Sequence, residues 1–351
     1  MREPPPLDLT QPFITPNLEG IGGRIRARPE DFRVEEVSLY EPTGEGSHLY
    51  VNITKKNKTT REVQKKIAML FNLRPQNIGT AGLKDKNAVT TQTFSILFEK
   101  NDVSEEDAVR RIERNIDVKV NWANFHINKF RAGHLVGNRF MITISGIRIP
   151  LGKAFERASL IAEQIHLRGM PNYYGDQRLG RGGKNILEGW EILNGEKRFK
   201  DRWLSKLLVA SYQSYLCNRY IAERVRRGLF DKLLLGDIVK KHETGGIFWV
   251  NDLAMDQPRF DSKEISFTAP IYGYKMSHPL AESAVLEAEI FEESEMSMKT
   301  FKRMKITGTR RFGRLTPEIE LTMNQRGIQL DFMLHKGAFA TTLLREFMKT
   351  G

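Results

Sequence analysis

The sequence predicts a mixed α/β or α+β protein built from two units. Segments in which apolar side chains alternate every two residues are interspersed with segments of helical spacing, which is typical of a mixed chain. The length of 351 residues favours two or three domains. Near residue 170 the composition becomes polar, aromatic and glycine-rich. This change indicates a linker or the start of a second domain.

Local signals predict the individual elements in order. Two strands are expected around the glycine-rich turn at 44–46. Thr59 and Glu62 have the spacing of a capping box, and Ser104 is suited to cap a second helix. Gly169 and Gly228 each follow a segment of helical spacing. The expected elements are strands within 22–56, 93–98 and 139–147, further short strands up to about 275, and helices over 59–74, 104–115, 151–168, 201–227 and 337–350.

Composition bounds the class of partner. Lysine and arginine number 55 against 43 acids, which gives a net charge of +12 and favours polyanions or anionic membranes. Six cations lie in 55–66 and six in 300–314, and each run is either a solvated face or part of a nucleic-acid surface. Glutamates between 282 and 295 are expected to form one solvated helix face. No stretch approaches the roughly 18 apolar residues of a membrane-spanning helix.

Cysteine and histidine usage excludes several kinds of site. Cys217 stands alone, so an internal disulfide, a cysteine zinc site and a deaminase zinc centre are excluded. A single cysteine favours the reducing cytoplasm, and the position of Cys217 in an apolar pattern predicts a core thiol. The histidines lack metal-ligand spacing, so no metal is expected. Residues 178–185 imitate a phosphate-binding loop but lack its first glycine and final serine or threonine.

One acid, Asp85, lies between Lys84 and Lys86 on a connection that is expected to join a helix to a strand. Asp85 is either a loop acid that forms a salt bridge or satisfies turn amides, or a carboxylate that neighbouring cations keep ionised as a nucleophile or base. Local physical chemistry leaves both interpretations open.

The segment "GTAGLKDKNAVTTQ", residues 79–92, closely resembles the catalytic segment of the TruD family of tRNA pseudouridine synthases. Six further segments resemble family segments in the same order and extend over nearly the whole chain. They read "RARPEDFRVEEV" (26–37), "GEGSHLYVNITKKNKTT" (44–60), "GNRFMITI" (137–144), "GMPNYYGDQRLG" (169–180), "SYQSYLCNRYIAER" (211–224) and "KGAFATTLLREFMK" (336–349).

This resemblance implies an α+β fold. A pseudouridine synthase catalytic domain with a mixed, largely antiparallel sheet would comprise residues 1–169 and 309–351. An inserted α/β TRUD domain would comprise residues 170–308. The implied function is isomerisation of a flipped-out uridine of tRNA, usually at position 13, by a cofactor-free cytoplasmic enzyme, with a monomer favoured. The alternative is a catalytically silent tRNA-binding protein on the same fold.

The resemblance also implies roles for individual residues. Asp85 falls on the catalytic aspartate, which works in the breakage of the N-glycosidic bond. Phe32, Asn138, Phe140 and Phe339 fall on positions that line the uracil pocket, although spacing alone predicts ordinary core packing for Phe140 and Phe339.

Other residues are expected to bind the substrate. Lys84 would neutralise a phosphate or hold the catalytic carboxylate. Arg26 stands where some relatives carry a lysine, so the charge is kept but a planar guanidinium replaces an ammonium. The signature segment contributes Asn172, Gln177 and Arg178, with a structural hinge as the alternative. From the basic run at 300–314, Arg310 and Arg311 are expected to contact RNA phosphates.

Overall fold

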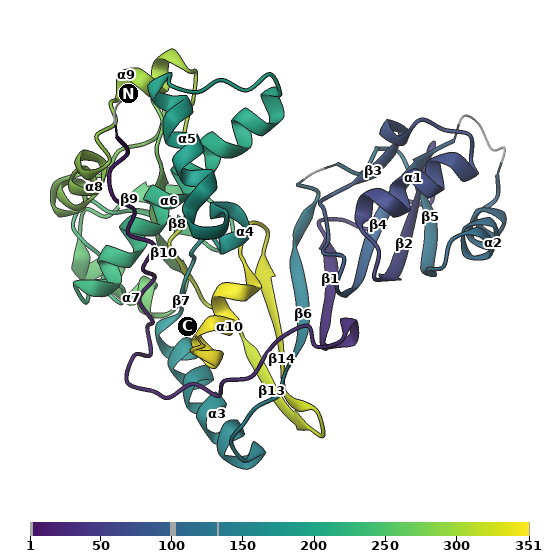
Figure 1. The fold of residues 1–351 in the computed structure, drawn as a ribbon, viewed down its shortest axis with the longest axis horizontal. Helices are drawn as coiled ribbons and strands as arrows, with labels where there is room; N and C mark the ends of the chain where they lie inside the picture. The colour runs from purple at the N-terminus through teal and green to yellow at the C-terminus, as the bar shows by residue number, and fades with distance from the viewer. Residues whose placement is uncertain (1–2, 99–102, 132, 351) are drawn as a thin grey trace. The chain divides into compact units, whose positions relative to one another are not determined.

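The computed structural model describes residues 3–98, 103–131 and 133–350, which form two compact units (Figure 1). We name the first the sheet unit, which comprises Gly20–Leu160, Glu318–Gly337 and Phe347–Gly351. The second, the helical unit, comprises Met1–Glu19, Ile161–Pro317 and Ala338–Glu346. The predicted domain division at 169 and 309 remains a prediction.

The sheet unit contains an eight-stranded sheet in the order β13-β14-β6-β1-β4-β2-β5, with β3 paired to β4. Among these strands β1 and β4 run parallel, and the other pairs are antiparallel. The two strands predicted around the glycine-rich turn are present, but β4 lies between them. The strands are β1 (Phe32–Ser38), β2 (His48–Lys56), β3 (Ile78–Thr80), β4 (Val89–Leu97), β5 (Lys119–His126), β6 (Leu135–Ser145), β13 (Ile319–Asn324) and β14 (Gly327–His335).

Two helices, α1 (Thr60–Leu70) and α2 (Glu105–Asn115), pack on one face of this sheet (Figure 1). The capping box before α1 is confirmed, since Thr59 Oγ1 accepts from Glu62 N at 3.1 Å and Glu62 Oε2 accepts from Thr59 N at 2.6 Å. The alternating residues of β2 and β4 meet the apolar sides of both helices. The resulting core includes Leu49, Val51, Ile53, Val63, Ile67, Phe94, Ile96 and Ile112.

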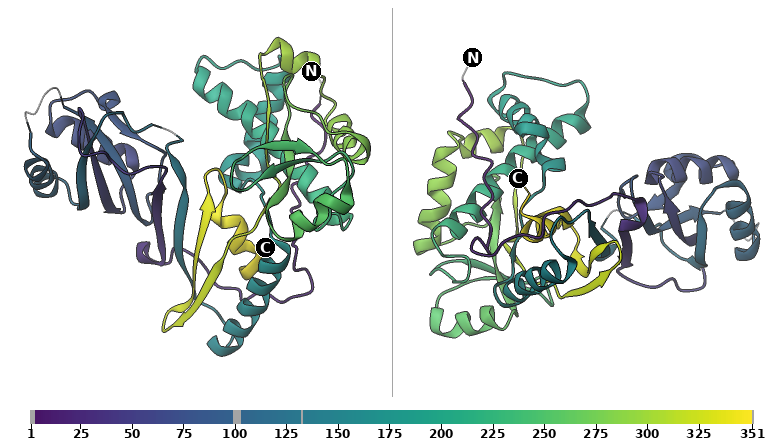
Figure 2. Two further views of the ribbon diagram at one scale, coloured as in Figure 1. Left: turned by 180° about the vertical axis from the view of Figure 1, so that it is seen from behind. Right: turned by 60° about the horizontal axis from the view of Figure 1, so that its bottom comes forward.

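The helical unit is organised around the long helix α6 (Arg202–Arg226), visible from two further directions in Figure 2. Asp201 caps its first turn, and Gly228 follows its end with a positive φ of 66°. A four-stranded antiparallel sheet, in the order β11-β10-β8-β9, packs against it. The strands are β8 (Ile238–Lys241), β9 (Ile247–Trp249), β10 (Ile265–Ile271) and β11 (Thr309–Phe312), with a separate pair of β7 (Met170–Pro171) and β12 (Arg314–Leu315).

Shorter helices complete the chain. They are α4 (Asp176–Leu179), α5 (Lys184–Asn194), α7 (Leu253–Asp261), α8 (Ala281–Glu293) and α9 (Met298–Arg303), with α3 (Leu151–Arg168) and α10 (Ala340–Met348) crossing the unit boundaries. Cys217 is a buried core thiol as predicted, and burial raises its pKa to about 11. Across the described ranges, no helix has the length and apolarity needed to span a membrane.

Candidate active site

The loop at 81–88, which carries Asp85, joins β3 to β4 and not a helix to a strand. The sequence analysis missed β3, whose three residues are too few to show a period. Backbone N of Lys84 donates to Thr60 Oγ1 at 2.8 Å, and Thr60 Oγ1 donates to Gln92 Oε1 at 2.7 Å. Gln92 Nε2 in turn donates to the carbonyl of the loop's glycine at 3.3 Å. The loop is therefore fastened to α1 and β4.

Asp85 forms an ion pair with Arg26. Arg26 Nη2 lies 2.5 Å from Asp85 Oδ2, and the two side chains are 26% and 40% exposed. The same guanidinium stacks over the ring of Phe32 with its Cζ 4.1 Å from the ring centroid. A planar guanidinium stacks and donates at once, which an ammonium does not do in the same geometry. Arg26 therefore fixes the carboxylate while leaving it accessible.

The lysines that flank Asp85 are directed to other acids. Lys84 points inward, where its Nζ lies 3.1 Å from Glu36 Oε2 and 2.7 Å from Asn138 Oδ1. Glu36 and Asn138 face each other across β1 and β6, so Lys84 bridges two neighbouring strands. Lys86 is exposed and lies 4.0 Å from a carboxylate of α1. The interpretation that the flanking cations hold the acid is wrong, because strand pairing offers Lys84 a better-buried partner.

Three aromatic rings pack against one another on β1, β6 and β14, beginning with Phe32, over which Arg26 stacks. Phe32 and Phe140 meet edge to face with centroids 6.4 Å apart. Phe140 stacks on Phe332 at 5.3 Å with an interplanar angle of 19°. All three are buried. Core packing therefore holds Phe32 and Phe140, whether or not a base also touches them. Phe332, which the sequence analysis missed, continues the buried alternation of β14.

A buried lysine, Lys55, lies in the same unit at the end of β2. It is 1% exposed, and its Nζ donates to the carbonyl of Lys58 at 2.7 Å. Burial lowers the pKa of Lys55 to about 8, and Lys84 adds to this effect, while Asp85 and Glu62 oppose it. The sequence analysis counted Lys55 only as one cation of a basic run. Its burial follows from the alternation of β2, which places it on the apolar side.

Six of the predicted substrate-binding residues lie in the helical unit, and four of them gather around Tyr174. Arg311 Cζ lies 3.9 Å and Arg178 Cζ 5.9 Å from the centroid of the Tyr174 ring. Phe339 meets the same ring edge to face at 5.7 Å. Asn172 accepts a hydrogen bond from Arg311 Nη2 and donates to a carbonyl of β11 at 2.7 Å. We name these five residues the Tyr174 cluster.

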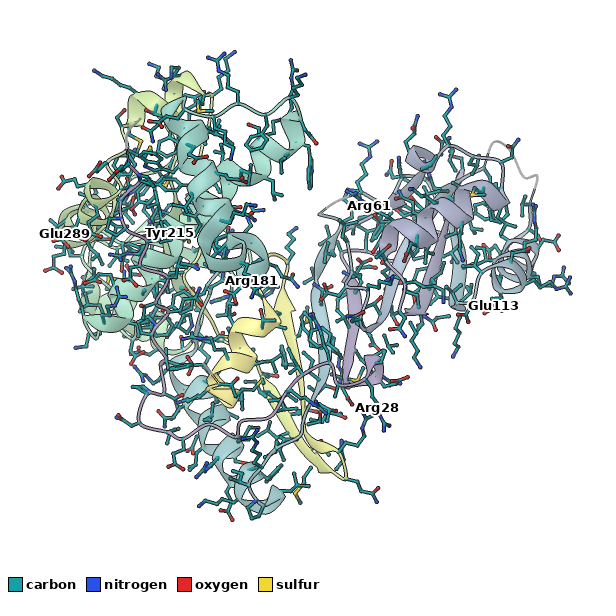
Figure 3. All side chains as sticks on the ribbon, in the orientation of Figure 1. Arg28, Arg61, Glu113, Arg181, Tyr215 and Glu289 are labelled. Atoms are coloured by element: carbon teal, nitrogen blue, oxygen red, sulfur yellow. The ribbon has the colours of Figure 1, made fainter. Side chains whose placement is uncertain are left out.

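Gln177 and Arg310 remain outside this cluster. Gln177 is exposed on α4, which ends shortly before Arg181 (Figure 3). Arg310 is buried, and its Nη2 lies 2.8 Å from Glu287 Oε2. The prediction that Arg310 contacts RNA phosphate is wrong, because its guanidinium already serves a core ion pair. Glu287, one of the glutamates predicted to lie on a solvated helix face, is buried for the same reason.

Two stretches of the chain, residues 10–200 and 198–347, match the family model described as tRNA pseudouridine synthase D (TruD). The chain belongs to the TruD family. It is 41% identical over 339 residues to the tRNA pseudouridine synthase D of a Thermus thermophilus strain, covering 96% of this chain and 92% of that relative. It is 38% identical over 346 residues to the tRNA pseudouridine synthase D of an Anaeromyxobacter dehalogenans strain, covering 96% of both chains.

Among solved structures, the crystal structure of a Methanosarcina mazei protein assigned as tRNA pseudouridine synthase D (TruD) has the same fold as this chain. The TM-score is 0.78 at 24% identity, covering 98% of this chain and 97% of that one. The predicted family and the predicted α+β fold are thereby confirmed, and the family places the chain among the isomerases. The roles of the individual site residues remain predictions.

Proposed function

We propose that this protein converts a uridine of tRNA to pseudouridine, with Asp85 as the catalytic residue. The observation that carries the proposal is the environment of the Asp85 carboxylate. It is 40% exposed on a loop that hydrogen bonds hold to α1 and β4, and it is paired with Arg26, whose guanidinium stacks on Phe32. An accessible carboxylate that an arginine orients suits a nucleophile or a base.

The reaction is balanced without a cofactor. The N1–C1′ bond of the uridine breaks, the base turns, and a new bond forms between C5 and C1′. The hydrogen on C5 leaves as a proton, and N1 gains a proton. Asp85 acts in the cleavage step, as a nucleophile toward the sugar or the base or as a base toward a sugar proton. A uridine must leave its helix to reach such a group, and the proposed target is position 13 of tRNA.

The neighbouring side chains suit recognition of an extruded base. Phe32 and Phe140 would support one edge of the uracil, while the Asn138 amide would read its polar edge. Lys84 holds Asn138 Oδ1 at 2.7 Å and thereby fixes the orientation of that amide. Phe339 lies in the other compact unit, and its contact with uracil stays a prediction. The cytoplasmic location, the monomeric state and the domain boundaries are predictions of the same kind.

Tritium release tests the proposal directly. Unmodified tRNA carrying uridine labelled at C5 must lose its label when the C5–C1′ bond forms. We expect release with the wild-type protein and none with Asp85→Asn. Release by both proteins would remove Asp85 from the reaction. If neither released label while both bound tRNA, the alternative of a catalytically silent tRNA-binding protein would replace the proposal.

A further inference from the structure

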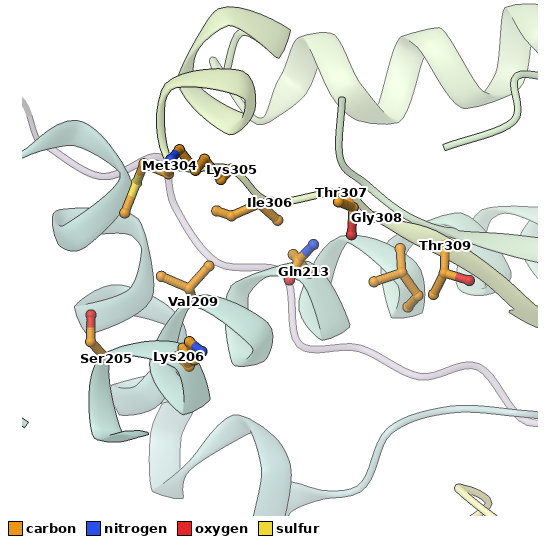
Figure 4. Close-up of a pocket in the computed structure, with 11 residues that line it drawn as sticks. Ser205, Lys206, Val209, Gln213, Met304, Lys305, Ile306, Thr307, Gly308 and Thr309 are labelled. Atoms are coloured by element: carbon orange, nitrogen blue, oxygen red, sulfur yellow. The ribbon is translucent and has the colours of Figure 1, made fainter. Parts of the chain in front are cut away.

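A pocket of about 390 Å³ opens in the helical unit between the start of α6 and the chain that leads from α9 into β11 (Figure 4). Its walls include the apolar side chains of Val209, Ile271 and Ile306, while Lys206 and Lys305 also line it. This volume lies in the range of about 300–1,000 Å³ typical of small-ligand sites. The pocket shares no residue with the loop that carries Asp85.

The pocket is held in shape by its own backbone. Gly308 has a φ of +73°, and a Cβ at this position would come within 2.6 Å of Gly273 N, so only glycine fits. On the α6 side, Gln213 Nε2 donates to the carbonyl of Tyr272 at 2.5 Å. The two walls are therefore fixed before any ligand binds, which reduces the entropy lost on binding.

Exposed cations are frequent in the two chain segments that supply Lys206 and Lys305 to the pocket lining. The ranges 198–206 and 299–305 contain eight exposed lysines and arginines. Against them these two ranges contain one acidic residue, Asp201, which caps α6. Such a field attracts phosphate groups. The eight residues are Arg198, Lys200, Arg202, Lys206, Lys299, Lys302, Arg303 and Lys305.

An indole ring stands among these cations. Trp203 is 62% exposed, whereas Trp190 is buried and Trp122 and Trp249 are 37% and 38% exposed. Trp203 precedes Lys206 by three residues on α6, so the two side chains are neighbours on the helix surface. An exposed tryptophan inside a cationic surface is the arrangement that proteins use to stack unpaired bases.

We propose that this surface binds unpaired nucleotides of the RNA substrate. A base stacks on Trp203, the adjoining phosphate lies between Lys206 and Lys305, and the next nucleoside enters the pocket against its apolar walls. The inference rests on the proposed function for the identity of the RNA. An acidic polypeptide would satisfy the cations but would use neither the indole face nor the apolar pocket.

The test uses the full-length Asp85→Asn protein, so that binding is measured without turnover. Affinity for unmodified tRNA is measured at two salt concentrations for Trp203→Ala, for Lys206→Gln combined with Lys305→Gln, and for Lys153→Gln as a control on α3. We expect Trp203→Ala to weaken binding about tenfold. The double variant should lower the slope of log Kd against log salt by about 1–2. The control should match the parent protein.

Fluorescence separates a nucleotide from other polyanions. Single-stranded oligouridylate should quench tryptophan emission, and Trp203→Phe should remove most of that quenching. Duplex RNA and polyglutamate should leave the emission nearly unchanged. Equal quenching by polyglutamate, or unchanged tRNA affinity in both variants, would overturn the proposal.

The failure of this inference is distinct from the failure of the proposed function. Pseudouridine formation by the wild type with no effect of Trp203→Ala on affinity would reject the surface and keep the reaction. Affinity that depends on Trp203 in a protein that releases no label from C5 would keep the surface and reject the reaction.

Discussion

The Asp85 site and the Tyr174 cluster both place an arginine over an aromatic ring, but they use it differently. Arg26 lies 4.1 Å above Phe32 and forms an ion pair with Asp85. Arg311 lies 3.9 Å above Tyr174 and donates to the amide of a signature residue. Stacking fixes the plane of a guanidinium in both places. In the first site the fixed plane orients the carboxylate of Asp85, whereas in the second it orients a neutral hydrogen-bonding group.

The largest expected effect on turnover comes from a substitution at Asp85. We expect Asp85→Asn to lower turnover by roughly 10³-fold or more, because the amide keeps the shape but loses the negative charge that a nucleophile or a base needs. Affinity for tRNA should stay within about twofold. Tritium release and filter binding measure the two effects. Lys86→Gln, on the same loop, is the matched control and should retain turnover. Comparable losses in both variants would mean that the loop, and not the carboxylate, had been damaged.

The next largest effect concerns stability and separates two adjacent arginines. Arg310→Met leaves Glu287 buried without its partner, so we expect the free energy of unfolding to fall by roughly 3 kcal/mol. Arg311→Met should cost less than about 1 kcal/mol and instead reduce the salt dependence of tRNA binding. Chemical denaturation compares the two variants. Equal stability losses would contradict the different roles assigned to these neighbours.

Lysine substitutions would sharpen the contrast between the two sites. Arg26→Lys keeps the charge but loses the stack on Phe32, so we expect about a tenfold fall in kcat with little change in KM. Arg311→Lys should leave kcat unchanged and raise KM by a few fold. Steady-state kinetics on unmodified tRNA separates these outcomes. A rise in KM alone for Arg26→Lys would show that Arg26 binds RNA instead of orienting the carboxylate.

The last effect is a pH dependence of stability that arises from Lys55. Its pKa is lowered from 10.5 to about 8 because burial disfavours the ammonium. At Lys55 the unfolded chain therefore binds more protons between these values, so the contribution of Lys55 to stability rises as the pH increases from about 8 to 10.5. The gain should be roughly 2 kcal/mol. The difference in unfolding free energy between wild type and Lys55→Met, measured at about pH 7.5 and about pH 10, isolates this contribution. A difference that does not vary with pH would rule it out.

Local patterns predicted the elements well, because capping and periodicity act over a few residues. The capping box at Thr59, the helix that begins after Asp201 and the helix from Leu151 to Arg168 are all present as expected. Such local patterns do not predict the order of the strands in the sheet. β4 separates β1 from β2, although those two strands flank a short turn-like segment in the chain.

By itself, the sequence determined the family, the α+β class and the choice of Asp85 as the candidate, because each depends on the identity and spacing of nearby residues. Only the tertiary structure decided the partners. Arg26 reaches Asp85 across 59 positions, and Lys84 finds Glu36 and Asn138 because β1 and β6 pair beside the loop. Arg310 was predicted to contact RNA but forms a core ion pair. Charge patterns record which groups are available, whereas strand pairing and burial decide which of them meet and which stay in water.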